Sequence, residues 1–264
     1  MSRISEKFDA LREKKEKALI VYLTAGDPSL IITKELILAL AKAGVDILEL
    51  GVPFSDPTAD GPVIQAAAQR ALKNGTTLAD ILEMISEVRQ VSQIPIILFG
   101  YFNPIFAFGV KKFARVAAHA GVDGVLVVDL PPEEASELRE YTDAEDIDFI
   151  FLVAPTTDTK RAQWIAGGAS GFLYYVSITG ITGTAAPRIA DLKTAIEKIR
   201  KITKLPVAVG FGISQPKQAK EIGQIADGVV IGSAVVRLID ENKNKHDLVN
   251  IVTDYTRAIK KSLS

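Results

Sequence analysis

The feature that most constrains the fold of this 264-residue chain is a series of eight short apolar runs spread along its whole length. The runs are rich in β-branched residues and lack the alternation of apolar and polar positions that marks a half-exposed strand. Near-continuous hydrophobicity is typical of parallel strands that are covered on both faces. The sequence therefore predicts eight buried strands, at residues 18–24, 46–50, 94–99, 124–130, 148–153, 171–176, 206–209 and 228–231.

Segments with helical spacing of apolar residues separate these runs, and several end in glycine just before the next strand. Examples are Ala43-Gly44-Val45-Asp46, Ala120-Gly121-Val122-Asp123 and Gly167-Gly168-Ala169-Ser170. Glycine at the end of a helix commonly adopts the left-handed conformation. The predicted helices cover residues 31–42, 63–73, 77–91, 110–119, 133–141, 190–202 and 216–225, with flanking helices at 5–15 and 247–261.

This alternation of strand and helix decides between two α/β architectures. Open doubly wound sheets usually stop at about six strands, whereas a closed barrel uses eight. Barrels of this kind commonly reach about 250 residues as one domain. We therefore expect residues 1–264 to form one α/β domain, a single (β/α)8 TIM barrel with additional flanking helices.

The composition excludes several classes of function. A formal net charge of −1 provides no general attraction for nucleic acid. The absence of cysteine excludes a disulfide framework, thiolate metal ligands and a cysteine nucleophile. Residues 1–17 are charged throughout, and no later apolar run reaches the roughly 18 residues of a membrane span. We expect a cytoplasmic protein that binds neither nucleic acid nor membranes.

The reactive groups of such barrels lie at the carboxyl ends of the strands and in the loops that follow. No lysine occupies these positions, so a Schiff-base mechanism has no candidate. The two histidines, His119 and His246, fall at a helix end and in a polar stretch, where we expect ordinary surface residues and no metal site. Carboxylates are therefore the candidate acid/base groups.

Glu49 lies inside a predicted strand, in the sequence Ile47-Leu48-Glu49-Leu50-Gly51. An unpaired charge buried there costs several kcal/mol. Two interpretations follow: a structural hydrogen bond satisfies the carboxylate, or burial raises its pKa and makes it a proton-transfer group. We favour the second, because perturbed carboxylates gather at functional sites.

The segment Gly51–Pro62 that follows is dense in proline and acidic residues, which predicts a loop. Pro62 is suited to the first position of a helix. On local evidence Asp60 is an N-terminal helix cap, and Asp56 is a turn residue before Pro57.

Three glycine-containing segments follow the sixth, seventh and eighth strands: residues 180–184, 210–214 and 232–234. Glycine there allows backbone N–H groups to approach an anion, and barrels frequently bind phosphate after strands seven and eight. A phosphorylated substrate is therefore favoured over glycines that serve only tight turns. Residues 179–189, rich in small side chains, are predicted to form a mobile lid.

With these residues assembled, the chain resembles the α subunit of tryptophan synthase over nearly its full length. The long acidic motif is specific to that family among barrels, whereas the glycine motifs are shared with other phosphate-binding barrels. The motifs are Tyr22-Leu23-Thr24-Ala25-Gly26-Asp27-Pro28, Glu49 through Pro57 with Ala59-Asp60-Gly61-Pro62, Asn103-Pro104-Ile105, Asp129-Leu130-Pro131 and Val209 through Ser214.

The resemblance implies cleavage of indole-3-glycerol phosphate into indole and glyceraldehyde 3-phosphate. Glu49 matches the family's acid/base, and Asp60 matches the carboxylate that stabilises the indole N–H, which outweighs the cap interpretation. Thr58 departs from a leucine that is common in the family, a change expected to alter loop packing. The implied substrate-binding residues are Tyr22, Tyr101, Tyr174, Thr182, Gly183, Gly212, Gly232 and Ser233, and for Tyr22 packing alone is an equal alternative.

The resemblance also implies an α2β2 complex with a β subunit that holds pyridoxal phosphate and accepts indole through a tunnel. No cofactor is expected in this chain itself. The expected interface comprises the loop 53–60 and residues 103–108, whose apolar side chains are otherwise hard to explain on a monomer.

Two other functions compete with this one. The first is another phosphate-binding barrel enzyme, such as a sugar-phosphate epimerase or the synthase that forms indole-glycerol phosphate, although the latter's catalytic lysines are missing from these strand ends. The second is a weakly active barrel that acts mainly as an activator of a β subunit. The presence of both Glu49 and Asp60 argues against it.

Overall fold

The computed structural model describes residues 2–176, 189–210 and 212–263. All its strands are parallel and follow the sheet order β5-β4-β3-β2-β1-β9-β8-β7-β6. The strands are β1 (Ala18–Thr24), β2 (Ile47–Gly51), β3 (Ile96–Gly100), β4 (Gly124–Val127), β5 (Asp148–Phe149), β6 (Phe151–Val153), β7 (Leu173–Val176), β8 (Val207–Gly210) and β9 (Gly228–Ile231).

The two ends of this sheet order belong to one stretch of chain. The predicted strand 148–153 is divided at Ile150, so that β5 pairs with β4 while β6 pairs with β7. One chain segment therefore joins both ends of the sheet, and the predicted (β/α)8 barrel is confirmed. Strand β4 ends at Val127, earlier than predicted, because a turn with a Leu130 N–H to Val127 carbonyl hydrogen bond follows it.

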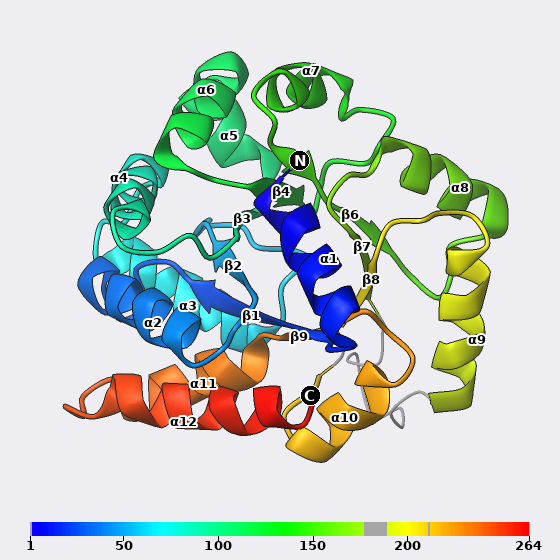
Figure 1. Ribbon diagram of the computed structural model, residues 1–264. Helices are drawn as coiled ribbons and strands as arrows, with labels where there is room; N and C mark the ends of the chain where they lie inside the picture. The colour runs from blue at the N-terminus through cyan, green and yellow to red at the C-terminus, as the bar shows by residue number, and fades with distance from the viewer. Residues whose placement is uncertain (1, 177–188, 211, 264) are drawn as a thin grey trace.

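Helices surround the barrel in chain order, as Figure 1 shows. The predicted glycine ends are confirmed at Gly44 and Gly121, whose φ angles are +94° and +89°, but α8 ends in an extended Ala169. The helices are α1 (Arg3–Lys14), α2 (Leu30–Lys42), α3 (Pro62–Lys73), α4 (Leu78–Arg89), α5 (Phe102–Phe108), α6 (Val110–Ala120), α7 (Ser136–Ala144), α8 (Thr159–Gly168), α9 (Ile189–Arg200), α10 (Pro216–Gly223), α11 (Ser233–Asn242) and α12 (Leu248–Lys261).

Alternation along each strand separates two apolar layers. Leu48 and Leu50 belong to the large cluster between strands and helices, whereas Ile47 belongs to the cluster inside the barrel. Because side chains alternate between the faces of a strand, Glu49 faces the barrel interior together with Ile47. This alternation fixes which side chains can reach a substrate in the barrel mouth.

Helix α1 closes the end of the barrel where the strands begin. Its buried residues Ile4, Phe8 and Leu11 join the interior cluster, and the Phe8 ring lies 5.6 Å from that of Phe172. Figure 1 shows α1 lying across this end of the barrel. The helix therefore plugs the closed end and leaves the opposite end, where the strands finish, for chemistry.

Three aspartates, each directly before a strand, link the start of that strand to the start of the adjacent one. Their carboxylates accept hydrogen bonds from backbone N–H groups that begin the adjacent strands. The pairs are Asp46 with Leu19 at 2.8 Å, Asp123 with Ile96 at 2.7 Å and Asp227 with Val207 at 3.0 Å. This explains the aspartate in the Gly-Val-Asp motifs, where the sequence analysis explained only the glycine.

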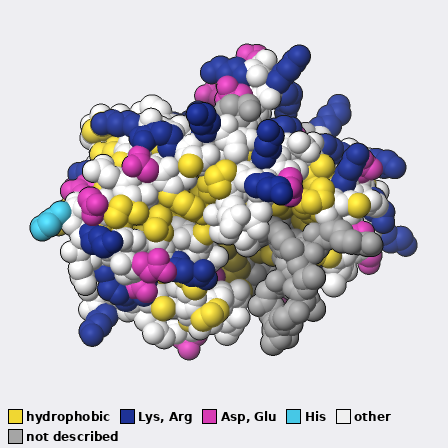
Figure 2. All heavy atoms as spheres, turned by 90° about the horizontal axis from the view of Figure 1, so that it is seen from below, with side chains coloured by type: hydrophobic (Ala, Val, Ile, Leu, Met, Phe, Trp, Pro, Cys, Tyr) yellow, Lys and Arg dark blue, Asp and Glu magenta, His cyan; other side chains and the backbone are white. Residues whose placement is uncertain are grey.

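The surface carries charges of both signs. On the face shown in Figure 2, Lys and Arg side chains are interspersed with Asp and Glu, which agrees with the net charge of −1. His119 and His246 are exposed, as predicted. Among the described residues, no helix has the length and apolar character needed to cross a bilayer, and no cluster of three His, Cys, Asp or Glu side chains is arranged to hold a metal ion.

Candidate active site

Glu49 carries a buried carboxyl group in the barrel interior. Its side chain faces the interior from β2, the residue is 1 % exposed, and its Oε1 atom has no hydrogen-bond partner among the described residues. Burial raises the pKa of Glu49 from an ordinary 4.5 to about 8. The structural hydrogen bond considered as an alternative is absent at Oε1, and at neutral pH this group holds a proton that it can donate.

Two tyrosines flank this carboxyl group. Tyr22 pairs with Glu49 in the register of β1 and β2, and the Tyr22 ring packs edge-on against Phe99 with 5.3 Å between centroids. Negative charge on Glu49 raises the pKa values of both Tyr22 and Tyr174, after burial as the main cause. Asp60 also raises the pKa of Tyr22, so the Tyr22 phenol lies within electrostatic range of both carboxylates.

Glycines at inward positions of two strands make room for these rings. A Cβ atom added to Gly51 would lie 1.9 Å from the Tyr22 hydroxyl, and one added to Gly210 would lie 2.1 Å from the Tyr174 hydroxyl. Sequence analysis did not identify this role. The signal was present, because Gly51 stands two residues after Glu49 and therefore on the same face of the strand.

Asp60 lies in the loop after β2 and does not cap the following helix. The N-cap of α3 is Gly61, which has no side chain to accept a hydrogen bond, and Pro62 is the first helical residue, as predicted. The Asp60 carboxylate instead accepts a hydrogen bond from the Tyr101 hydroxyl at 3.1 Å. The helix-cap interpretation of Asp60 is therefore wrong.

Tyr101 holds the loop and the carboxylate together. Its hydroxyl also accepts the Ala59 N–H at 2.9 Å, and its ring packs on Phe54 at 5.3 Å. Partial burial raises the pKa of Asp60, while the hydrogen bond from Tyr101 opposes that rise. Tyr101 therefore favours the ionised form of Asp60.

Helix α5, which the sequence analysis missed, positions Tyr101 at its N-cap. The Asp129 carboxylate accepts the N–H of Phe102, the first residue of this helix, at 2.8 Å. A chain of contacts thus runs from Asp129 through α5 and Tyr101 to Asp60. Asp129 had been noted only as part of a family motif.

The predicted phosphate-binding residues lie after β8 and β9. Gly232 is the N-cap of α11, and Ser233 is its exposed first residue, so the N–H groups of Ser233 and Ala234 have no acceptor within the helix, whereas Val235 and Val236 donate to the Gly232 carbonyl. Gly212 has a φ angle of +46° and open space on its Cβ side. Thr182, Gly183 and residues 179–188 of the predicted lid 179–189 lie outside the described residues.

A parallel (β/α)8 barrel that holds a buried carboxyl group with a raised pKa in its interior has the fold of the barrel enzymes and a group suited to acid–base chemistry. The family model for the tryptophan synthase alpha chain matches residues 8–263. A tryptophan synthase alpha chain of Geobacter sp. (strain M21) is 51 % identical over 263 residues, covering 100 % of this chain and 98 % of that one. The chain therefore belongs to the tryptophan synthase alpha chain family.

Solved structures agree with this assignment. Tryptophan synthase subunit alpha from Legionella pneumophila str. Paris matches with a TM-score of 0.93 and 38 % identity, covering 100 % of this chain and 98 % of that chain. Tryptophan synthase from M. tuberculosis, in an aminoacrylate-bound form, matches with a TM-score of 0.89 and 31 % identity over 100 % of both chains. The chain is accordingly a lyase of tryptophan biosynthesis that cleaves indole-3-glycerol phosphate to indole and glyceraldehyde 3-phosphate, and the epimerase, synthase and activator alternatives are set aside.

Proposed function

We propose that Glu49 and Asp60 carry out this cleavage. The observation that carries the proposal is the buried Glu49 carboxyl group, protonated below a pKa of about 8 and without a hydrogen bond at Oε1. Protonated Glu49 gives its proton to C3 of the indole ring. The resulting carboxylate takes the proton of the glycerol hydroxyl as the carbon–carbon bond breaks, which forms the aldehyde and returns the bonding electrons to the ring.

Asp60 acts at the other side of the ring in this proposal. Protonation at C3 places positive charge on the indole nitrogen, and an ionised carboxylate beside the N–H stabilises that charge. The hydrogen bond from Tyr101 supports this role because it lowers the pKa of Asp60, against the effect of burial, and so favours the ionised form. Tyr22, Tyr101 and Tyr174 then form the walls of the indole pocket. Release of indole by the isolated chain, compared with its Glu49 and Asp60 variants, tests these roles.

Replacing Tyr101 with phenylalanine is expected to lower kcat/KM for cleavage by about tenfold to a hundredfold, the value of one hydrogen bond to a charged group. The substitution removes the donor to Asp60 and raises the pKa of Asp60 further. Steady-state rates across pH therefore show the acidic limb of the profile moving to higher pH. An unchanged acidic limb contradicts the positioning role.

We propose that Gly212, Gly232 and Ser233 bind the substrate phosphate, with Thr182 and Gly183 completing the site. The open N-terminus of α11 supports this assignment, because its free N–H groups and the positive end of the helix dipole attract anions.

An aspartate at position 233 tests the phosphate site. The Ser233→Asp variant places negative charge where the phosphate would bind, so KM is expected to rise at least about tenfold, equivalent to about 1.4 kcal/mol of lost binding. Ser136→Asp is a matched control, because Ser136 is the exposed first residue of α7. Equal KM values for the two variants would place the phosphate elsewhere.

We propose that the chain pairs with a tryptophan synthase β subunit in an α2β2 complex, with pyridoxal phosphate held by the β subunit and none by this chain. The support is an exposed apolar group beside the candidate site. Phe106 on α5 is 62 % exposed, and its ring lies 5.9 Å from that of Phe102. Tyr101 stands at the start of α5 and is hydrogen-bonded to Ala59 and Asp60 in the loop 53–60. A partner that binds either segment therefore influences the position of the Asp60 carboxylate.

Phe106→Asp is expected to weaken binding of the β subunit by at least about tenfold, since burying a charge in place of an aromatic anchor opposes association. The cleavage rate of the isolated chain stays unchanged. Ile31→Asp on α2 provides the control, because Ile31 is even more exposed but lies on the outer ring of helices. Equal β affinity of both variants, measured by calorimetric titration, would remove α5 from the interface.

We further propose that residues 1–264 form one domain, and that the protein works in the cytoplasm. The first strand, β1, pairs with the last, β9, and the C-terminal helix α12 anchors Lys260 on Asp46 at 2.7 Å, which supports one unit. A role in tryptophan biosynthesis supports the location.

A further inference from the structure

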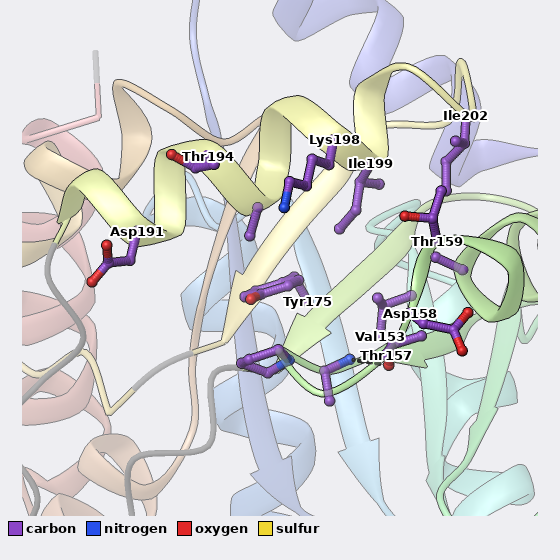
Figure 3. A pocket seen from close by; sticks show the side chains of 14 residues that line it. Val153, Thr157, Asp158, Thr159, Tyr175, Asp191, Thr194, Lys198, Ile199 and Ile202 are labelled. Carbon is purple, nitrogen blue, oxygen red and sulfur yellow. Dashed lines mark hydrogen bonds between the residues drawn. The ribbon is translucent and has the colours of Figure 1, made fainter.

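A cavity of about 460 Å³ lies outside the barrel, against β6, β7, α8 and α9. Figure 3 shows its lining side chains. Tyr175 belongs to the cluster between strands and helices, whereas its neighbour Tyr174 packs with the cluster inside the barrel. The strand layer therefore separates this cavity from the candidate active site. Its volume falls within the range of about 300–1,000 Å³ that is usual for small-molecule sites.

The cavity is lined by a tyrosine whose hydroxyl has no hydrogen-bond partner among the described residues. The Tyr175 residue as a whole is only 4 % exposed, and its hydroxyl faces the cavity. Burial raises the pKa of this phenol, so it stays a hydrogen-bond donor at all physiological pH values. Tyrosine hydroxyls of largely buried residues usually have a partner, and the cavity is the space next to this hydroxyl that a ligand acceptor could occupy.

The ammonium group of a lysine also lines this cavity. Lys198, an exposed residue, extends from α9 toward the Tyr175 ring, as Figure 3 shows, and within the described part of the chain it takes part in no ion pair or hydrogen bond. Two other polar groups of the lining have local roles: the Asp158 carboxylate caps α8 by accepting the Arg161 N–H at 2.8 Å, and the Thr194 hydroxyl donates to the Ala190 carbonyl at 3.0 Å. Lys198 and Tyr175 thus provide two donors with no acceptor among the described residues.

The charge pattern and the apolar lining select the ligand. Lys198 is the single cationic side chain among the described lining residues, so it matches a ligand with one negative charge. The Asp158 carboxylate in the same lining disfavours a doubly charged phosphate. The rest of the lining includes Val153, Ile199 and Ile202, which offers apolar contact to a flat ring.

We propose that this cavity binds a small aromatic monocarboxylate, whose carboxylate accepts hydrogen bonds from Lys198 and Tyr175 while its ring packs on the aliphatic lining. The site is independent of the cleavage chemistry. It does not use Glu49, Asp60 or the phosphate-binding residues.

Calorimetric titration of the whole chain with 2-naphthoate tests the proposal. The expected result is one saturable site per chain. Lys198→Met is expected to weaken binding by at least tenfold, and Tyr175→Phe by at least threefold. Lys193→Met is the matched control: Lys193 lies on the same helix, is exposed and does not line the cavity, so binding stays unchanged.

Three results would overturn the proposal: no saturable binding at millimolar 2-naphthoate, equal affinity of the Lys198→Met and Lys193→Met chains, or displacement by saturating indole-3-glycerol phosphate in the Glu49→Gln chain. Tyr175→Phe retains the ring and its packing. It therefore decides the matter if the Lys198 variant does not fold, and an affinity equal to that of the unmodified chain then counts against the site.

Discussion

Glu49→Gln is expected to reduce the rate of indole release by about 10²- to 10⁴-fold, the range contributed by general acid–base catalysis. Glutamine retains the shape of the side chain but cannot donate a proton to C3. In the unmodified chain, activity is expected to fall as the pH rises through about 8, where Glu49 loses its proton. The variant's residual activity lacks that basic limb, and its binding of a β subunit is preserved.

The same substitution is expected to stabilise the fold. A loss of activity in a variant that is more stable than the unmodified chain cannot be caused by unfolding. The folded chain raises the pKa of Glu49 from 4.5 to about 8, so the folded state favours the protonated carboxyl group. This favourable contribution is complete below pH 4.5 and is lost as the pH rises toward 8. Glutamine cannot ionise, so the Tm advantage of the variant grows over that interval. Appreciable residual lyase activity would reject Glu49 as the proton donor.

Asp123→Ala is expected to lower the free energy of unfolding by about 3–5 kcal/mol, the usual loss when one partner of a buried ion pair is removed. The Asp123 carboxylate contacts Arg3 and Arg89 at 2.7 Å each, and it also accepts the Ile96 N–H. The Asp123 side chain is 3 % exposed and that of Arg89 is 9 % exposed. Alanine would leave the Arg89 charge buried and the N–H of β3 without its acceptor.

Urea unfolding measures this loss, with Asp254→Ala as the control. Asp254 pairs with Arg257 at the surface with 71 % of its side chain exposed, and exposed pairs contribute at most about 1 kcal/mol. If both variants lost the same stability, the aspartates at the strand starts would have no special role in holding the barrel together.

The strands were predictable because burial on both faces requires a near-continuous run of apolar residues, which is visible in the sequence. The same rule placed Glu49 correctly, since a charged residue inside an apolar run indicates an unusual environment. The division of the fifth strand at Ile150 could not be predicted from the run itself. It depends on the pairing of the first half with β4 and of the second half with β7.

Asp60 shows where local evidence is insufficient. Its sequence neighbours favour a helix cap, whereas its actual partner, Tyr101, is 41 residues away in the chain. Helix α5 was missed for a similar reason: Pro104 argues against a helix in the sequence, but it lies in the first turn, where its missing N–H is not needed. Only the family resemblance predicted a role for Asp60 other than a helix cap, and that role is the one we propose above.

The central claim is that Glu49 is a protonated carboxylic acid in the barrel mouth at neutral pH. Difference infrared spectroscopy of the unmodified chain against Glu49→Gln measures this directly through the carboxyl C=O band. We expect a protonated band at pH 7 that disappears with a midpoint near pH 8. A carboxylate band already present at pH 6 would contradict the account, because the group would then have no proton to give to the indole ring.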